Sequence, residues 1–242
     1  MGKIDDIQAY KEWTEYHRSL KRDKAADNLS PVERKKKLEK LEANVIEWIL
    51  FFFSEFAKYP FTKFHKKAIK RITTNMEWYE VLSWSRELAK STIVFMCMMY
   101  LVLTGKKKNV LLISNSHENA VRLLEPYKKA FESNSMLKAY YGDLREFGSW
   151  TADEFTLTTG ATFRAIGALE SPRGTRKDAV RPDTALVDDF DTDADCRNPD
   201  ILKKKWEWFE EALFPTRSIS EDLLVIFCGN LLALDCCVKR AG

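Results

Sequence analysis

Residues able to bind phosphate come together in one stretch of the chain, residues 84–92. A short apolar segment, 80–84, precedes a tight loop, and Lys90-Ser91-Thr92 then opens a long apolar run. A strand, a loop and a helix in this order form a phosphate-binding loop, in which backbone N–H groups and the helix N-terminus hold the anion. In that chemistry the lysine contacts the β- and γ-phosphates and the next hydroxyl binds Mg²⁺.

The match to the phosphate-loop consensus G-x-x-x-x-G-K-[ST] is incomplete. Trp84 stands at its first glycine and Ala89 at its second. Because Lys-Ser-Thr also begins many ordinary helices, the rest of the chain has to supply the other parts of a nucleotide site. The predicted nucleotide-binding residues are Ser85, Arg86, Glu87, Leu88, Ala89, Lys90, Ser91 and Thr92.

A pair of carboxylates supplies the second part of such a site. Residues 184–187 are an apolar strand that ends in Asp188-Asp189. Ligands of open α/β sheets bind at the carboxyl ends of the strands, where this pair and the loop would converge. We expect Asp188 to hold Mg²⁺ through water or Ser91, and Asp189 to polarise the attacking water. The alternative interpretation of Asp-Asp is an acidic turn without chemistry.

Arginines before that strand could supply the third part of such a site, a cation. Phosphoryl transfer gains from a cation placed on the charge of the transition state, in the same chain or from a neighbour. Arg86, inside the loop, and Arg173 are the candidates. A role on the surface or toward DNA is an equal alternative for either side chain.

The order of the expected elements predicts an α/β domain over residues 59–242, with a mostly parallel central sheet and helices on both faces. A helical N-terminal region, residues 1–58, precedes it. We expect strands at 80–84, 110–114, 184–187 and 223–227, a hairpin of 155–158 with 162–166, helices at 64–72, 90–103, 117–132 and 199–214, and a polar loop at 171–183.

The N-terminal region is expected to hold two helices. In the first, Ile4, Ile7, Tyr10 and Trp13 are spaced for one apolar face. The second begins at a capping box of Ser30 and Glu33, becomes apolar from residue 45, docks on the main domain and ends before residue 60. We interpret residues 35–37, a run of three lysines, as a solvated helix face, with DNA contact as the minor alternative.

Composition sets bounds on the class of protein. A chain of 242 residues that is 45% hydrophobic can bury a substantial core, and a net charge of +3 permits a polyanionic partner without demanding one. The five cysteines form no C-x-x-C pair and the three histidines show no metal-ligand spacing, so neither a disulfide framework nor a zinc site is expected. The apolar runs are too short or too charged to cross a membrane, and we expect a soluble, intracellular chain.

These segments together resemble the N-terminal ATPase domain of the large terminase subunit of tailed bacteriophages. Residues 85–92 resemble the deviant Walker A motif of that family, which carries an arginine early in the loop and often lacks the first glycine. Residues 181–191 resemble its Walker B strand with the preceding Arg-Pro-Asp. Residues 226–230 stand where the family has its coupling motif, which assigns γ-phosphate sensing to Gly229 and Asn230.

Two further segments carry the same resemblance. Residues 171–174 are similar to the Arg-Gly segment ahead of Walker B, which makes Arg173 a catalytic residue acting on a neighbouring subunit. Residues 60–65 resemble the upstream segment that packs near the adenine. The resemblance covers the chain from about residue 61 onward.

The resemblance implies the RecA-like fold of P-loop NTPases. It also implies a hydrolase that couples Mg²⁺-dependent ATP hydrolysis to translocation of double-stranded DNA into a procapsid. It implies ATP and Mg²⁺ as cofactors and a homo-oligomeric ring, a pentamer, on the portal. Double-stranded DNA, the portal protein and the small terminase subunit would be its partners, and the location would be the host cytoplasm at the procapsid. Members continue into an RNase H-like nuclease domain, which we do not expect in these residues, so nuclease activity is not expected either.

Two departures from the family pattern leave alternatives open. Asp189 stands where many members have a catalytic glutamate, so Asp191 is an alternative carboxylate. The distance in sequence from Arg173 to the carboxylates is long, so Arg176 or Arg181 could act instead. The alternative functions are a helicase-like ATPase fragment and a non-catalytic module that binds nucleotide or serves assembly.

Overall fold

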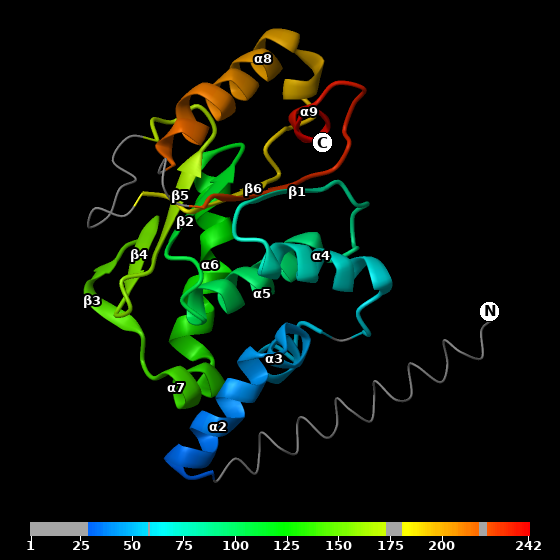
Figure 1. The fold of residues 1–242 in the computed structure, drawn as a ribbon. Coiled ribbons are helices and arrows are strands. Elements are labelled where there is room, and N and C mark those ends of the chain that lie inside the picture. Colours follow the sequence, from blue (N-terminus) through cyan, green and yellow to red (C-terminus); the bar gives the residue numbers. More distant parts are fainter. Residues whose placement is uncertain (1–28, 58, 173–180, 218–221) are drawn as a thin grey trace, which may run out of the picture.

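A computed structural model describes residues 29–57, 59–172, 181–217 and 222–242. Over these residues the chain is a layered α/β structure with helices on both sides of one sheet (Figure 1). The described sheet has seven strands in the order β1-β7-β6-β2-β5-β4-β3. The strands are β1 (Trp78–Leu82), β2 (Asn109–Ser114), β3 (Arg145–Trp150), β4 (Glu154–Leu157), β5 (Thr162–Gly167), β6 (Thr184–Asp188) and β7 (Leu224–Cys228).

Five strands of this sheet run parallel, from β1 at one edge through β7, β6 and β2 to β5. The hairpin of β4 and β3 extends the sheet antiparallel to β5. The sequence therefore predicted the mostly parallel α/β sheet and its helical layers correctly. Because β1, β7, β6 and β2 are parallel neighbours, their carboxyl ends meet at one edge of the sheet.

The two faces of the sheet are built by strict alternation along the central strands. Leu112, Leu186 and Ile226 belong to one buried cluster, whereas Leu111 and Val187 belong to the other. The first cluster packs against α3 (Val45–Phe52), α4 (Lys63–Thr74), α5 (Lys90–Leu103), α6 (His117–Ser133) and α7 (Ser135–Tyr141). The second packs against α8 (Pro199–Glu207), the π-helical turn η2 (Trp208–Leu213) and α9 (Cys237–Ala241).

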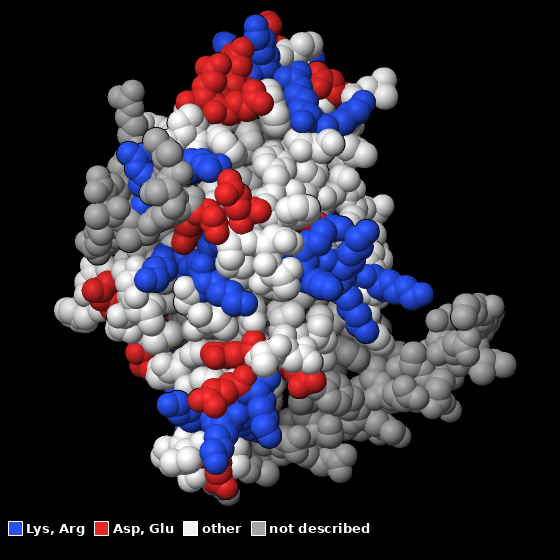
Figure 2. All heavy atoms as spheres, in the orientation of Figure 1, with Lys and Arg blue, Asp and Glu red and all other residues white. Residues whose placement is uncertain are grey.

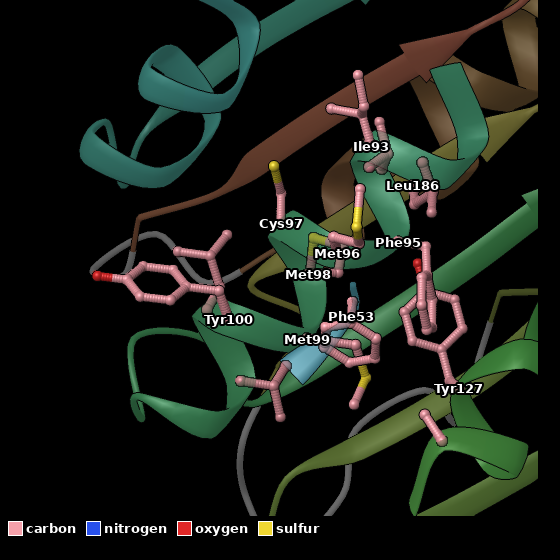
Figure 3. Close-up of a cluster of buried hydrophobic side chains, with 14 of the residues drawn as sticks. Phe53, Ile93, Phe95, Met96, Cys97, Met98, Met99, Tyr100, Tyr127 and Leu186 are labelled. Carbon is pink, nitrogen blue, oxygen red and sulfur yellow. The ribbon is translucent and has the colours of Figure 1, made fainter. Parts of the chain in front are cut away.

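Helix α5 lies at the centre of the first face and is apolar all round. Its residues from Ile93 to Val102 are all buried, and Phe95 packs against Phe53, the residue after α3, and against Tyr127 of α6 (Figure 3). A helix buried on every side keeps a fixed position relative to the sheet. The predicted bounds of this helix, 90–103, are those of the structure.

The N-terminal helices differ from the prediction at one point. The capping box of Ser30 and Glu33 starts α2 (Pro31–Glu42) as expected. The predicted single helix is wrong, however, because α2 ends at Glu42 and Asn44 starts a separate helix, α3. The Asn44 side chain accepts hydrogen bonds from the N–H groups of Ile46 and Glu47 (3.2 and 3.4 Å), which favours a new helix start over continuation.

The docking of this apolar segment on the main domain is confirmed. Trp48 and the residues after it as far as Phe53 are buried in the cluster that contains α5. Tyr100 donates a hydrogen bond to the Glu42 carbonyl (2.7 Å), and Asn134 donates one to the Phe52 carbonyl (3.0 Å). The predicted first helix, residues 1–28, lies outside the described residues.

Other predicted elements are present with shifted bounds. The predicted hairpin is β4 with β5, but β3 was missed because most of its side chains are exposed and give no alternating pattern. Strand β1 starts two residues before the prediction, since Trp78 and Tyr79 pair with Leu224 and Val225. The predicted helix 199–214 is α8, followed by η2 and the 3-10 turn η3 (Phe214–Thr216).

In the described part of the chain, no helix is long and apolar enough to cross a membrane. All five cysteines are free thiols, and four of them are buried.

Candidate functional site

A cavity of about 730 Å³ lies at the carboxyl edge of the parallel strands. Its size is within the range of small-molecule sites. It is lined by the loop between β1 and α5, the first turn of α5 and the segments that follow β2, β6 and β7. The lining includes Arg86, Glu87, Leu88, Ala89, Lys90, Ser91, Thr92, Asn115, Asp188, Asp189, Asp191, Asp193, Gly229 and Asn230.

The β1–α5 loop, residues 83–89, adopts two left-handed backbone conformations. Glu87 has φ +69° and Ala89 has φ +58°. A glycine takes this conformation without strain, whereas an alanine there costs about 1 kcal/mol. Ala89 thus has a backbone conformation that glycine adopts most easily, although the residue is an alanine.

The N-terminus of α5 opens into the cavity. Its N-cap residue, Ala89, has no polar side chain and makes no side-chain cap, and the first intrahelical bond is from the Ile93 N–H to the Ala89 carbonyl (2.9 Å). The first-turn N–H groups, on residues 90–92, precede that bond and point along the positive end of the helix dipole. This arrangement favours an anion in front of α5.

The Lys90 ammonium group connects the loop with the end of β7. It donates hydrogen bonds to the carbonyls of Trp84 (2.5 Å) and Ser85 (3.4 Å) and to Oδ1 of Asn230 (2.9 Å). Lys90 is only 9% exposed, and Asn230 is 140 residues away in sequence. The structure therefore brings the predicted loop lysine and the predicted coupling asparagine into direct contact.

Gly229, the other predicted coupling residue, lies beside Asn230 in a tight space. Its N–H donates to the Leu82 carbonyl (3.2 Å), which joins the ends of β7 and β1. A Cβ at this position would lie 3.2 Å from the Val238 side chain of α9. Position 229 therefore favours glycine because a neighbouring helix packs against it.

Ser91 and Asp188 form the second connection across the cavity. The Ser91 hydroxyl donates to Oδ2 of Asp188 (2.5 Å), across 97 residues of sequence. Asp188 is 7% exposed, and burial raises the pKa of its carboxyl to about 6, although the Ser91 hydrogen bond opposes that shift. The two predicted metal ligands are thus adjacent.

Asp189 follows Asp188 directly, and its side chain is exposed at the cavity. Its backbone is held on both sides. Its N–H donates to Oδ1 of Asp188 (3.0 Å), and its carbonyl accepts from the Asn115 side chain (2.9 Å) and backbone (3.3 Å). These contacts hold φ of Asp189 at +45° and turn the chain away from β6.

Asp191, the alternative carboxylate, has a different contact. Its Oδ2 accepts a hydrogen bond from the Cys237 N–H at the start of α9, while Oδ1 has no partner among the described atoms. One oxygen of Asp191 therefore holds α9 in place. The geometry favours Asp189 over Asp191 as the carboxylate that acts on a ligand.

The predicted arginines differ in their position relative to the cavity. Arg86 lines the cavity. Arg173 and Arg176 lie outside the described residues. Arg181 is exposed at the opposite edge of the sheet, because it precedes β6, whereas the cavity lies beyond the end of that strand. Seven extended residues span about 20 Å, so Arg181 cannot reach the cavity of its own chain.

Sequence reasoning missed Asn115. This residue follows β2 directly, and its side chain donates to the Asp189 carbonyl and accepts from the Asn119 side chain (2.9 Å). The signal was present, since a polar residue after a buried strand in an open α/β sheet lies at the ligand edge.

Aromatic residues of the upstream segment pack beside the loop. The ring centroids of Phe64 and Trp84 lie 4.8 Å apart, and those of His65 and Trp84 lie 5.5 Å apart. Nε2 of His65 is 3.1 Å from the Leu88 carbonyl, and the Thr62 N–H donates to Nδ1 (3.4 Å). Both contacts fit a neutral imidazole with its proton on Nε2, and burial lowers the pKa of His65.

The charges around the cavity are predominantly negative. Its lining has the two cations Arg86 and Lys90, and the five carboxylates Glu87, Asp188, Asp189, Asp191 and Asp193. The described residues contain no cluster of three or more His, Cys, Asp or Glu that could hold a metal by itself. A polyphosphate would therefore need a divalent cation to offset the carboxylates, and that cation would need ligands from the polyphosphate or from water.

Comparison of the sequence with protein-family models and with curated proteins finds no match.

Proposed function

We propose that the cavity binds Mg·ATP and that the chain is a P-loop ATPase of the RecA-like class. The observation that carries this proposal is the contact between the Ser91 hydroxyl and Asp188. A hydroxyl at the start of a helix and a carboxylate at the end of a neighbouring strand are the pair that holds Mg²⁺ in P-loop enzymes. Lys90, adjacent to that hydroxyl, supplies the cation for the phosphates.

The residues present fit both groups. The first turn of α5 and Lys90 would hold the phosphates, and Ser91 with Asp188 would hold the metal. When bound, Mg²⁺ supplies positive charge that the acidic lining otherwise lacks. A phosphate would compete with the Trp84 and Ser85 carbonyls for the Lys90 ammonium group, so ligand binding would rearrange that lysine.

Asp189 would orient and deprotonate the attacking water. Its carboxylate is exposed at the cavity and its backbone is fixed by Asp188 and Asn115, so its position does not depend on a flexible loop. Asn230 contacts Lys90 directly and would register the loss of the γ-phosphate through that lysine. This path from the phosphates to β7 is the chemical basis for the coupling role of Gly229 and Asn230.

The biological role that we propose follows from the resemblance of the motifs to large terminase subunits. The chain would act as the ATPase domain of a viral DNA-packaging motor, in a ring on the procapsid portal, with the small terminase subunit and double-stranded DNA as partners. Support comes from the way the predicted loop, Asp188, Asp189 and Asn230 converge on one cavity. Arg173 would act from a neighbouring subunit.

A steady-state ATPase assay tests the enzymatic part of the proposal. Lys90→Ala and Asp188→Ala should abolish Mg²⁺-dependent hydrolysis, and Asp189→Asn should lower kcat by about 10²–10⁴-fold while nucleotide still binds. Lys36→Ala, an exposed lysine of α2, is the control and should be as active as wild type. Equal background rates in wild type and all variants would refute an ATPase.

The same assay separates the alternatives. Stimulation by double-stranded DNA that salt abolishes would favour a translocase. Nucleotide binding without turnover, unchanged in Asp189→Asn, would favour the non-catalytic module.

A further inference from the structure

Helix α4 has a row of lysines on its outward face. Lys63, Lys66, Lys67 and Lys70 are all exposed, and Figure 2 shows a compact group of basic side chains over this helix. At 3.6 residues per turn the four side chains fall within about 100° of one another around the helix. Ala68, Ile69 and Ile72 form the buried side of α4, away from this row.

The lysine row has no acidic partner among the described residues. Helix α4 contains no Asp or Glu, and none of the four lysines forms an ion pair with a described residue. Some basic side chains of other elements do pair with acids, as Arg122 does with Glu118 (2.6 Å) and Arg240 with Asp235 (2.6 Å), but α4 has no acid of its own to offer. Within the described part of the chain, the row is therefore a surface of one charge without an acidic partner.

The row does not help α4 to fold. Lysines three and four residues apart on a helix repel each other, and each such pair costs about 0.2–0.5 kcal/mol. The helix already gains its stability from its buried side and from the Arg71–Glu80 ion pair. A row of lysines that weakens its own helix and has no acidic partner among the described residues is a candidate surface for a polyanion.

We propose that the α4 lysine row, residues 63, 66, 67 and 70, is a docking surface for the phosphate backbone of double-stranded DNA. The row extends about 10 Å along the helix, and a duplex presents one negative charge per about 1.7 Å of its axis, so several phosphates lie within reach. Lysine ammonium groups are point charges that bind phosphates without reading bases, which suits a protein that must hold any sequence.

The chemistry of the row favours a duplex over a single strand. Single-strand binding surfaces place aromatic rings between the cations so that bases can stack. In the α4 row no aromatic side chain lies between the lysines. Phe64, the exposed aromatic residue of α4, packs against Trp84 and His65 instead.

The position of α4 gives the surface a functional consequence. His65, between the lysines in sequence, contacts the Leu88 carbonyl of the β1–α5 loop (3.1 Å). DNA on α4 would therefore lie on a helix that touches the proposed nucleotide site directly. The choice of DNA as the polyanion rests on the proposed function. The observation that the lysine row has no acidic partner among the described residues does not depend on it.

The test measures DNA binding without nucleotide, so that it does not depend on hydrolysis. Wild type and a variant with Lys63, Lys66, Lys67 and Lys70 all changed to Gln are titrated by fluorescence anisotropy with a random-sequence duplex of about 30 base pairs, between about 50 and 200 mM salt. We expect the variant to bind at least about tenfold more weakly, with a log–log salt slope shallower by about 3 to 4.

A matched control removes the same charge elsewhere. Changing Lys35, Lys36, Lys40 and Lys129 to Gln alters four exposed lysines of α2 and α6. This control should bind as wild type does, and thermal unfolding should show both variants folded. Three results would overturn the proposal: no binding by wild type, equal binding by the α4 variant and wild type, or equal losses in both variants.

Competitors decide the class of ligand. An unlabelled duplex should displace the labelled one, and polyglutamate of equal charge should compete much less well. Equal competition by polyglutamate would mean an acidic protein surface or a general polyanion and would contradict a DNA surface. Wild type could bind and hydrolyse ATP while the α4 variant binds DNA as tightly as wild type does. That result would contradict the docking surface and leave the ATPase proposal intact.

Discussion

Single residues of the site hold conformations and charges that ordinary surface residues avoid. Ala89 and Asp189 have left-handed backbones, and Asp188 is a buried carboxyl without a cation as its hydrogen-bond partner. Such strain at a cavity costs stability and is retained where the site needs it. The two features give predictions about stability that do not require the ligand to be known.

The first prediction concerns the pH dependence contributed by Asp188. Its folded pKa of about 6 lies above the unfolded value of 3.8. The folded state therefore binds more protons between these values, and stability falls as pH rises from about 4 to 7. Relative to Asp188→Asn, wild type should lose about 2–3 kcal/mol of unfolding free energy between pH 4 and pH 7.5 in metal-free buffer.

Denaturant unfolding at the two pH values measures this difference. Comparing the variant with wild type cancels the contributions of other titrating groups. A difference that stays constant with pH would show that the pKa of the Asp188 carboxyl is the same in the folded and unfolded states, and would contradict the raised value.

The second residue-scale prediction tests the loop backbone. Ala89→Gly should stabilise the protein by about 0.5–1 kcal/mol, because glycine removes the left-handed strain. Ala139→Gly, in the exposed interior of α7, should destabilise it by a similar amount, because glycine there only adds backbone entropy to the unfolded chain. Thermal unfolding of both variants checks the signs, and destabilisation by Ala89→Gly would argue against a left-handed residue 89.

At this scale the sequence predicted most of the residues around the cavity but not their contacts. Lys90, Ser91, Asp188 and Asn230 were identified by motif, and the structure adds that they touch in pairs. The role of Asp191 at α9 was not predictable, because it depends on where a distant helix begins.

Secondary-structure elements were predicted best where one face of the element, or the whole element, is buried. Helix α5 and strand β6 are continuous apolar runs, so their bounds were correct to within one residue. Strand β3 was missed because its exposed side chains follow no period, and the break between α2 and α3 was missed because a single capping asparagine decides it. The hydrogen bonds that the Asn44 side chain accepts set this boundary.

The element-scale prediction concerns the contact of α4 with the β1–α5 loop. His65→Ala removes the hydrogen bond to the Leu88 carbonyl, so the loop should lose part of its fixed shape. A hydrogen bond of about 0.5–1.5 kcal/mol corresponds to a loss of about two- to tenfold in nucleotide affinity. Lys66→Ala, the neighbouring exposed position, should leave nucleotide affinity unchanged, and equal effects of the two variants would contradict this role.

In the whole molecule, a tightly packed face of the sheet positions the cavity at the carboxyl ends of the strands. Helix α5 is enclosed by α3, α4, α6 and the sheet, so its N-terminus has a fixed position relative to the carboxyl ends of β6 and β7. The cavity is formed by segments that are far apart in sequence and become neighbours only through the strand order β1-β7-β6-β2. The order of motifs in the sequence could not supply that arrangement by itself.

Assembly gives a prediction at the same scale. If Arg173 acts on a neighbouring subunit, mixing Arg173→Ala protein with Lys90→Ala protein should partly restore ATPase activity, because some interfaces then join an intact loop to an intact arginine. Mixing Lys90→Ala with Asp188→Ala protein is the control and should restore none, since both changes fall in the same cavity. The absence of rescue at concentrations where rings form would exclude a role for Arg173 between subunits.

The central claim is that the cavity binds Mg·ATP, and calorimetric titration tests it most directly. Such a titration measures binding alone and does not depend on turnover or assembly. Wild type should bind one nucleotide per chain, and Lys90→Ala should bind at least about tenfold more weakly, as expected for loss of a charged hydrogen-bond donor. Chelation of Mg²⁺ should weaken binding in wild type, and Lys36→Ala should match wild type. An undetectable wild-type titration, or equal affinity in wild type and Lys90→Ala, would contradict the assignment of this cavity as a nucleotide site.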